Sequence, residues 1–385
     1  MYGGVKWAMI IVCNKGNSGR TITRDSSGSL VLESKEGESA ILLRECSHDY
    51  DAAVMPGGEI NVFAVSESGT LYRIRCSKDE TKATAILDSR EAGKKIGALR
   101  CLALGGTVHL FYCVESKARY MLVHHILSGD SVAGQPRVLD YIGAKCCYGI
   151  CSDDSYNINI LYVDESEKLK CVTYKNSQKT YAASVTQCGD TIRALCPVVH
   201  GDSLYAAYLS RTREYNVINV LRLSDGVSKT VGFGVDLLSE PCMFEYGDGL
   251  CVQWCEKGYA FECRTENDME FCKPVSLGKS LQTAYLRSEE NGRLGKIDKC
   301  AVSASGSIYK SALSAFESAC GENRCKTAGE EVAEYAERNL KSMAGANDSD
   351  DEYSISKRLS EIESRLDEIS EYLMKNVMSK GEKTE

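Results

Sequence analysis

The chain has 385 residues, a formal net charge of −8 and 43% hydrophobic residues. This length is enough to bury a large core and favours more than one domain. No stretch approaches about 20 uninterrupted apolar residues, so we expect no membrane-spanning helix, and the lack of a basic stripe leaves nucleic-acid binding without an electrostatic basis.

The N-terminal segment predicts a strand. Trp7–Cys13 is apolar, but it is too short for a good signal-peptide core and no small-residue cleavage site follows it. We therefore expect a cytoplasmic protein. The turn Asp25–Leu30 matches the later turn Ser66–Leu71, and Ala40–Arg44 is apolar. Together these segments indicate a weak first copy of a repeated unit.

The repeat itself is clearest in its second strand. Ile60–Ser68 aligns without a gap with Val108–Ser116 and with Ile158–Ser166, and Leu204–Ser210 and Leu250–Cys255 continue the series more loosely. The five segments begin at residues 60, 108, 158, 204 and 250. A period of about 40–50 residues containing short strands is typical of β-propellers.

One unit illustrates the expected content of a blade. Four strands are predicted, at Ala52–Met55, Ile60–Val65, Leu71–Cys76 and Ala83–Leu87, with turn residues between them. In the third of these, Leu71, Arg73 and Arg75 alternate with Tyr72, Ile74 and Cys76, which predicts one solvated face. Four short strands joined by three turns make one blade.

The first strands of later units are apolar on both faces. Leu99–Leu104, Ala194–Val199 and Cys242–Tyr246 have this character, which suits inner strands packed between neighbours around a channel. After the last clear unit, Thr283–Arg287 and Lys299–Ser303 predict two more strands of an incomplete blade. We expect the two ends of the chain to share that blade and so close the ring, which removes exposed sheet edges.

The predicted fold class is therefore mainly β, a β-propeller of about seven four-stranded blades over residues 1–305, with six blades as the alternative. At the level of blade pattern, the chain resembles β-propeller repeat proteins in general. That resemblance implies binding surfaces on the broad faces and in the central channel. A β-helix or a sandwich is the structural alternative, but the spacing is too long for β-helix coils and too regular for a sandwich.

Nineteen cysteines are present, and we expect them to be reduced thiols because no export signal accompanies them. Cys113 and Cys255 stand in the repeat column of Val65, Val163 and Leu209, where cysteine replaces an aliphatic residue. Thiols recur on the inner strands, at Cys101, Cys151, Cys196, Cys242 and Cys300. The preferred interpretation is packing of small apolar side chains; the alternative is a ring of thiols that binds a metal or senses oxidants.

No catalytic, cofactor-binding or metal-ligating residue is predicted. The five histidines form no ligand set, since His109 belongs to a second strand and the adjacent His124 and His125 face opposite ways on a strand. Ser66–Tyr72 faintly resembles the Asp-box of sialidase-like propellers, although that motif has aspartate at the Ser68 position. The aromatic column Tyr112, Tyr162, Tyr208 and Trp254 is interpreted as packing between blades.

The C-terminal tail, residues 306–385, has a different sequence pattern. We predict a helical extension over 306–345, an acidic linker over 346–353 and a coiled-coil helix over 354–380. The apolar heptad positions, and hence the predicted oligomerisation residues, are Ile355, Leu359, Ile362, Leu366, Ile369 and Leu373. Leucine at a with isoleucine at d favours a trimer or tetramer. The alternative is a lone amphipathic helix that folds back on the propeller or lies on a membrane.

These features favour a non-enzymatic interaction scaffold without a cofactor, in which the coiled coil gathers several propellers and each presents a face to an unknown protein partner. The alternative is a ligand-binding or hydrolytic propeller, with carbohydrate as the ligand class. A weaker alternative is a thiol-based redox or metal sensor.

Overall fold

A computed structural model describes residues 9–303, apart from residues 15–16, 35–37, 78–79, 89–94, 105, 118, 130, 145, 154, 176–177, 188–191, 212–213, 235–238, 247–248, 258, 268, 291–292 and 295–299. By its internal contacts the chain divides into two compact units, residues 1–322 and 323–385. The predicted extension, linker and coiled-coil helix, with all six heptad residues, lie outside the described residues.

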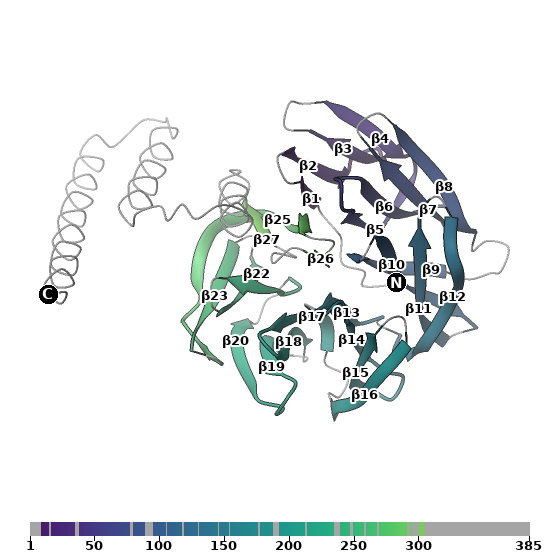
Figure 1. Cartoon of the computed structure of the whole chain (residues 1–385). Helices are drawn as coiled ribbons and strands as arrows, with labels where there is room; N and C mark the ends of the chain where they lie inside the picture. The colour runs from purple at the N-terminus through teal and green to yellow at the C-terminus, as the bar shows by residue number, and fades with distance from the viewer. Residues whose placement is uncertain are drawn as a thin grey trace, which may run out of the picture. The chain divides into compact units, whose positions relative to one another are not determined.

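Six four-stranded units make up the described part of the chain, and Figure 1 shows them set like blades around a common axis. Blade 1 has β1 (Met9–Asn14), β2 (Asn17–Arg24), β3 (Leu30–Glu33) and β4 (Ser39–Leu43). Blade 2 has β5 (Cys46–Val54), β6 (Ile60–Ser66), β7 (Thr70–Cys76) and β8 (Thr81–Asp88). Blade 3 has β9 (Lys95–Leu104), β10 (Thr107–Ser116), β11 (Arg119–Ser128) and β12 (Ser131–Ile142).

The second half repeats this order. Blade 4 has β13 (Tyr148–Ser152), β14 (Ile158–Val163), β15 (Lys168–Lys175) and β16 (Gln178–Gln187). Blade 5 has β17 (Ile192–His200), β18 (Ser203–Arg211), β19 (Asn216–Arg222) and β20 (Ser228–Gly234). Blade 6 has β21 (Cys242–Tyr246), β22 (Gly249–Glu256), β23 (Tyr259–Asn267) and β25 (Val275–Glu290), with β24 (Glu270–Phe271), β26 (Arg293–Leu294) and β27 (Cys300–Ser303) paired at its edges.

One long strand closes the ring. Val275–Lys279 of β25 pairs antiparallel with β23 of blade 6, and Ala284–Ser288 pairs in parallel with β1 of blade 1. The two ends of the chain thus close the ring, as expected, but they do so by pairing β25 with β1 and not by sharing an incomplete blade. The preferred count of seven blades is wrong for the described residues, which hold six: Thr283–Arg287 is the second half of β25 and not a strand of a further blade.

The core lies between blades rather than in one centre. Apolar clusters fill the seams, the term used here for the contact between two neighbouring blades. Representative pairs are Ile22 with Tyr50 (blades 1 and 2), Phe63 with Leu110 (2 and 3), Phe111 with Ile160 (3 and 4), Leu161 with Ala206 (4 and 5), and Ile218 with Trp254 (5 and 6). Because each middle strand faces two seams, β6 and β14 are buried at every residue. Burying one such aliphatic side chain stabilises the fold by about 1.5–3 kcal/mol.

The third strand of blade 2 differs from its prediction. Arg73 was expected on a solvated face, yet it is only 5% exposed. Its Nε donates to Asn61 Oδ1 at 2.7 Å, and its Nη1 donates to the carbonyl of Gly129 in blade 3 at 2.7 Å. Arginine here satisfies a buried position because both ends of its guanidinium find acceptors.

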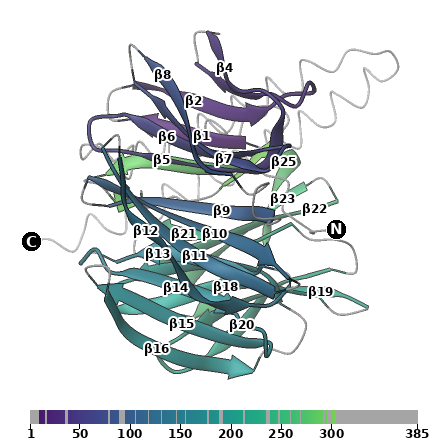
Figure 2. The same ribbon diagram turned by 90° about the vertical axis from the view of Figure 1, so that its right-hand side faces the viewer.

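The first strands of neighbouring blades are joined by side-chain-to-backbone bonds. Asp51 in β5 is fully buried, and its carboxylate accepts the N–H groups of Ala52 at 2.8 Å and of Cys101 in β9 at 2.9 Å. Tyr148 in β13 donates its hydroxyl to the carbonyl of Ala98 in β9. Between blades 5 and 6, the N–H of Met243 donates to Cys196 Sγ at 3.3 Å. Figure 2 shows these strands from the side, stacked along the ring.

Between blades 4 and 5 the backbones of the two first strands approach closely. A Cβ added at Gly149 in β13 would lie 2.7 Å from the carbonyl oxygen of Leu195 and would overlap the Pro197 ring. Both obstacles are on β17, so the two backbones cannot move apart without opening the seam.

We expect Gly149→Ala to lower the free energy of unfolding by about 2–3 kcal/mol, because the new methyl group overlaps packed atoms. Gly143→Ala, in the same blade, is the matched control, since its Cβ would lie 3.4 Å from the nearest atom, the carbonyl oxygen of Asp164. Urea unfolding of the two variants measures the difference. Equal stability of both variants would contradict this account of the seam.

Candidate functional site

Three turns between the second and third strands of a blade share one hydrogen-bonding pattern. The side-chain oxygen of the first turn residue accepts the N–H of the fifth, as Asp25 does from Ser29 (2.9 Å), Ser66 from Thr70 (3.1 Å) and Asp164 from Lys168 (2.9 Å). These short polar side chains favour such turns because they bond their own backbone. This bond fixes the backbone of the turn, and with it the position of the second turn residue.

This arrangement clarifies the faint resemblance to an Asp-box. The sequence comparison placed the motif's aspartate at the Ser68 position. The oxygen that holds the turn instead comes from Ser66, and Ser68 Oγ lies 2.8 Å from Ser66 Oγ. In blade 4 the first position is the carboxylate of Asp164, so a structural turn explains the pattern.

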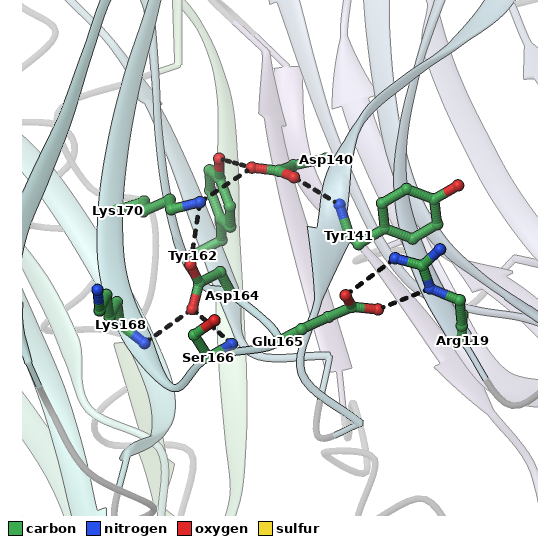
Figure 3. A network of polar contacts seen from close by, with 9 residues as sticks. All are labelled: Arg119, Asp140, Tyr141, Tyr162, Asp164, Glu165, Ser166, Lys168 and Lys170. Carbon is green, nitrogen blue, oxygen red and sulfur yellow. Dashed lines mark hydrogen bonds and ion pairs between the residues drawn. The ribbon is translucent and has the colours of Figure 1, made fainter.

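The second turn residue of blade 4 forms a bridge to blade 3. Glu165 accepts two hydrogen bonds from Arg119 in β11, with Nε–Oε1 and Nη2–Oε2 distances of 3.0 Å each (Figure 3). The Arg119 guanidinium also lies over the ring of Tyr141 in β12, with 3.6 Å between Cζ and the ring centroid. Tyr141 is 37% exposed. We call Arg119, Tyr141 and Glu165 the seam triad.

The triad is accessible to solvent. Hydrogen bonding to Arg119 holds the pKa of Glu165 below its usual value, and the same bond raises the pKa of Arg119. More than two fifths of each of these two side chains is exposed. An exposed ion pair contributes little to stability because water and salt screen it. The bridge is therefore expected to contribute little to the stability of the fold.

Beneath the triad, a second group of polar side chains continues the network along the seam. Asp140 in β12 accepts the hydroxyl of Tyr162 at 2.6 Å, and its Oδ2 lies 3.5 Å from Lys170 Nζ. Lys170 also pairs with Asp164 at 2.9 Å. Figure 3 shows the ammonium group between the two carboxylates, one from each blade.

Hydrogen bonding keeps these carboxylates ionised. Partial burial alone would raise the pKa of Asp140, but bonds from Tyr162, the Tyr141 N–H and Lys170 outweigh it and leave the pKa lowered. For Asp164, burial is likewise outweighed by bonds from the Lys168 N–H and Lys170, so its pKa is also lowered. The bond with Asp164 raises the pKa of Lys170. All three groups are charged at neutral pH.

The chemistry of the seam follows from these charges. Three carboxylates, Asp140, Asp164 and Glu165, bond two cations, Arg119 and Lys170, so the network has no surplus of positive charge. An anionic ligand gains nothing there, whereas a neutral ligand with several hydroxyl groups finds both donors and acceptors. The exposed face of Tyr141 adds an apolar surface beside them.

A related bridge occurs between blades 1 and 2. Glu67 stands in the same repeat column as Glu165, and its Oε1 lies 3.1 Å from Nη2 of Arg24. The Nε of Arg24 donates to the Cys46 carbonyl at 2.6 Å. This bridge uses a single oxygen of Glu67, and no ring contact to Arg24 is found among the described residues.

A third polar group lies on the inner strands. Asp49 accepts the N–H of Ala98 at 2.9 Å and holds that residue at φ +54°, while Arg100 lies 3.9 Å from Glu240, which precedes β21. Burial raises the pKa of Asp49. Because Asp49 bonds the backbone of the neighbouring blade, we assign this group to ring assembly rather than to a ligand.

The histidines of blade 3 are packed, as expected for His109. His109 Nδ1 lies 3.0 Å from His124 Nε2, and His124 stacks on Phe111. Burial lowers the pKa of His109 to about 4 and that of His124 to about 3. Both rings are neutral at pH 7. His125 is also buried, at 3% exposure.

The inner-strand cysteines lie in the seams. Cys101, Cys151, Cys196 and Cys242 are buried, and Cys101 and Cys196 belong to the apolar clusters between blades 2 and 3 and between blades 5 and 6. The side chain of Cys300 lies outside the described residues. Within the part of the chain that the structure describes, no group of three or more His, Cys, Asp or Glu side chains is placed to hold a metal ion. The packing interpretation of the described thiols agrees with these positions.

Sequence reasoning missed the seam triad. The residues that it did single out for oligomerisation lie beyond residue 303, outside the described range. One signal was available, because Glu67, Glu115 and Glu165 share a repeat column. Of the aromatic column, Tyr112, Tyr162 and Trp254 are buried, which supports their interpretation as packing.

No protein-family model matches the chain, and no curated protein is detectably similar to it. Solved structures with a similar fold include the SapL1 lectin in complex with α-methyl fucoside, with 12% identity, a TM-score of 0.47, and coverage of 71% of this chain and 97% of that one. A six-bladed propeller lectin from Aleuria aurantia has 12% identity, a TM-score of 0.42, and coverage of 72% and 99%. TolB from Acinetobacter baumannii has 12% identity, a TM-score of 0.40, and coverage of 65% and 60%.

No helix among the described residues has the length and apolar character needed to cross a bilayer.

The two histidines predict how stability depends on pH. Their pKa values are lower in the folded state than the ordinary value of about 6.5, so the unfolded chain binds protons first as the pH falls. The contribution of these two neutral histidines to the free energy of unfolding is fully present above pH 6.5, and it is lost as the pH falls toward 4. We expect His109 and His124 together to account for roughly 2–4 kcal/mol of loss between pH 7 and 5.

Urea unfolding at pH 7 and pH 5 tests this expectation. The double variant His109→Phe, His124→Phe is expected to lose less stability over this interval than the native chain, and His48→Gln, at an exposed site, is the control. The same loss in the double variant and in the native chain would contradict the assignment.

Proposed function

We propose that the propeller is a non-enzymatic carbohydrate-binding module, with a ligand site at the seam between blades 3 and 4. The observation that carries this proposal is the seam triad, an exposed aromatic ring stacked under a guanidinium that is held by a carboxylate from the next blade. Flat polar groups with fixed directions suit the vicinal hydroxyls of a sugar, and the ring suits its apolar face.

The charges at the seam support binding over hydrolysis. A glycosidase needs one carboxyl group with a raised pKa that protonates the leaving oxygen. Here the pKa values of Asp140, Asp164 and Glu165 are all lowered. None of the three is held ready as a general acid at neutral pH.

The residues of the site also meet across a joint between blades. Arg119 and Tyr141 belong to blade 3 and Glu165 to blade 4. A ligand that contacts all three binds only the assembled propeller. Because the aromatic ring and the ion pair are already in place, little side-chain ordering opposes binding.

Binding is tested with a glycan array, followed by titration calorimetry of the best ligand. Methyl α-fucoside is included because similar structures contain fucosides. We expect Tyr141→Ala and Glu165→Gln each to weaken binding by about tenfold or more, since each removes one component of the triad.

Asp225→Asn is the matched control. Asp225 also accepts two bonds from an arginine, Arg222, but within one hairpin of blade 5. We expect this variant to bind as the native chain does. Absence of any bound glycan, or binding that survives both Tyr141→Ala and Glu165→Gln, would overturn the proposal.

We further propose that the C-terminal tail brings several copies of this site together in one oligomer. The heptad residues between Ile355 and Leu373 are the observation that favours a trimer or tetramer. Several propellers joined by one coiled coil bind a multivalent partner at the same time, which converts weak individual contacts into avidity. This holds whether the partner is a glycan or a protein. We also propose a cytoplasmic location, because every cysteine that the structure describes is a free thiol.

Deleting residues 354–385 is expected to reduce the molecular mass in solution three- to fourfold by light scattering, as a trimer or tetramer requires. The variant Leu359→Ala, Leu366→Ala, Leu373→Ala is expected to do the same while keeping the tail. A monomer both before and after the deletion would contradict the predicted coiled coil.

A further inference from the structure

Two thiols of blade 6 lie side by side near the surface. Cys263 is in β23, and Cys272 follows β24, which folds back along it. Cys263 Sγ donates to the carbonyl oxygen of Cys272 at 2.8 Å, which places the two residues in direct contact. The strand pairing also fixes the backbone here, because the Cys272 N–H donates to the Arg264 carbonyl at 2.8 Å.

The two sulfurs differ in environment. Cys263 is 1% exposed, whereas Cys272 is partly exposed. Burial raises the pKa of Cys263 to about 12. Cys272 Sγ accepts the backbone N–H of Arg264 at 3.2 Å. An accessible sulfur that accepts a hydrogen bond, beside a buried one, is the arrangement of an attacking and a resolving thiol.

We propose that Cys272 and Cys263 form a reversible disulfide when the protein meets a low-molecular-weight disulfide such as oxidised glutathione. This inference is independent of carbohydrate binding. It assigns thiol-based redox sensing to two specific residues, which lie outside the inner strands.

The steps balance in atoms and electrons. The Cys272 thiolate attacks one sulfur of oxidised glutathione, its S–S bond breaks, and one glutathione thiolate leaves. The Cys263 thiol then gives its proton to solvent and attacks the Cys272 sulfur, which expels the second glutathione. Two protein thiols lose two electrons, and one oxidised glutathione becomes two reduced molecules.

A second pair of thiols provides an internal control. Cys113 in β10 and Cys146, before β13, belong to the same apolar cluster. Both are buried in the seam between blades 3 and 4. Because no dissolved disulfide reaches them in the folded protein, we expect this pair to stay reduced under conditions that oxidise the pair in blade 6.

The experiment treats the native full-length protein with oxidised glutathione, then blocks free thiols with an alkylating agent under denaturing conditions. Trypsin cuts after Arg264 and places Cys263 on residues 258–264 and Cys272 on residues 265–279, since Lys273 precedes a proline. We expect these two peptides to appear joined by a disulfide, which dithiothreitol reverses. Cys113 and Cys146 are expected to carry the alkylating agent.

Two variants separate the steps. Cys263→Ser is expected to stop at Cys272 joined to one glutathione, and Cys272→Ser is expected to leave Cys263 unmodified. A circular-dichroism melt of each variant verifies folding. If native protein carries glutathione on Cys272 without the cross-link, or if both thiols remain alkylated, the proposal is wrong. Equal oxidation of Cys113 and Cys146 would also overturn the proposal, since solvent exposure would then not explain why the pair in blade 6 is oxidised.

Discussion

The structure depends on how the first strands of neighbouring blades are held together. Backbone ladders bind strands within a blade, and across most seams no such ladder exists. Asp51 supplies one replacement, because its buried carboxylate accepts a backbone N–H from the next blade. Tyr148 and Cys196 make analogous contacts at other seams, and β25 closes the ring by pairing with both end blades. Apolar clusters fill the seams, and their burial adds to the stability of the ring.

The same constraint explains where a ligand site develops. Side chains from two blades meet only at a seam, and at its outer end they reach solvent. Deep in the seam between blades 3 and 4, residues such as Phe111 and Ile160 are fully buried. Farther out, Lys170 joins carboxylates of both blades, and at the surface Arg119 and Glu165 remain exposed. This progression from apolar packing to paired charges is why an exposed polar network, the proposed ligand site, forms there without an unpaired buried charge.

The sequence predicted the blade pattern well, because middle strands buried on both faces repeat as apolar runs, as at Ile60–Val65. It did not predict the blade number. Thr283–Arg287 was predicted as a strand of a further blade, whereas it belongs to one continuous strand that serves two sheets. The solvated face assigned to Arg73 was wrong because its guanidinium finds acceptors in the adjacent blade, a contact that local alternation does not encode. For the same reason the seam triad was missed: the repeat column contains Glu165, but its partners Arg119 and Tyr141 depend on how two blades dock.

The most direct test of this account of the seams is hydrogen exchange at the Cys101 amide, whose acceptor is the carboxylate of Asp51. In native protein this amide is expected to exchange only with global unfolding, as slowly as the Val62 amide in the centre of blade 2. In Asp51→Ala, Cys101 is expected to exchange much faster than Val62 in the same sample, because its bond across the seam is gone. Equal protection of the two amides in that variant would contradict the claim that side-chain bonds hold the first strands together.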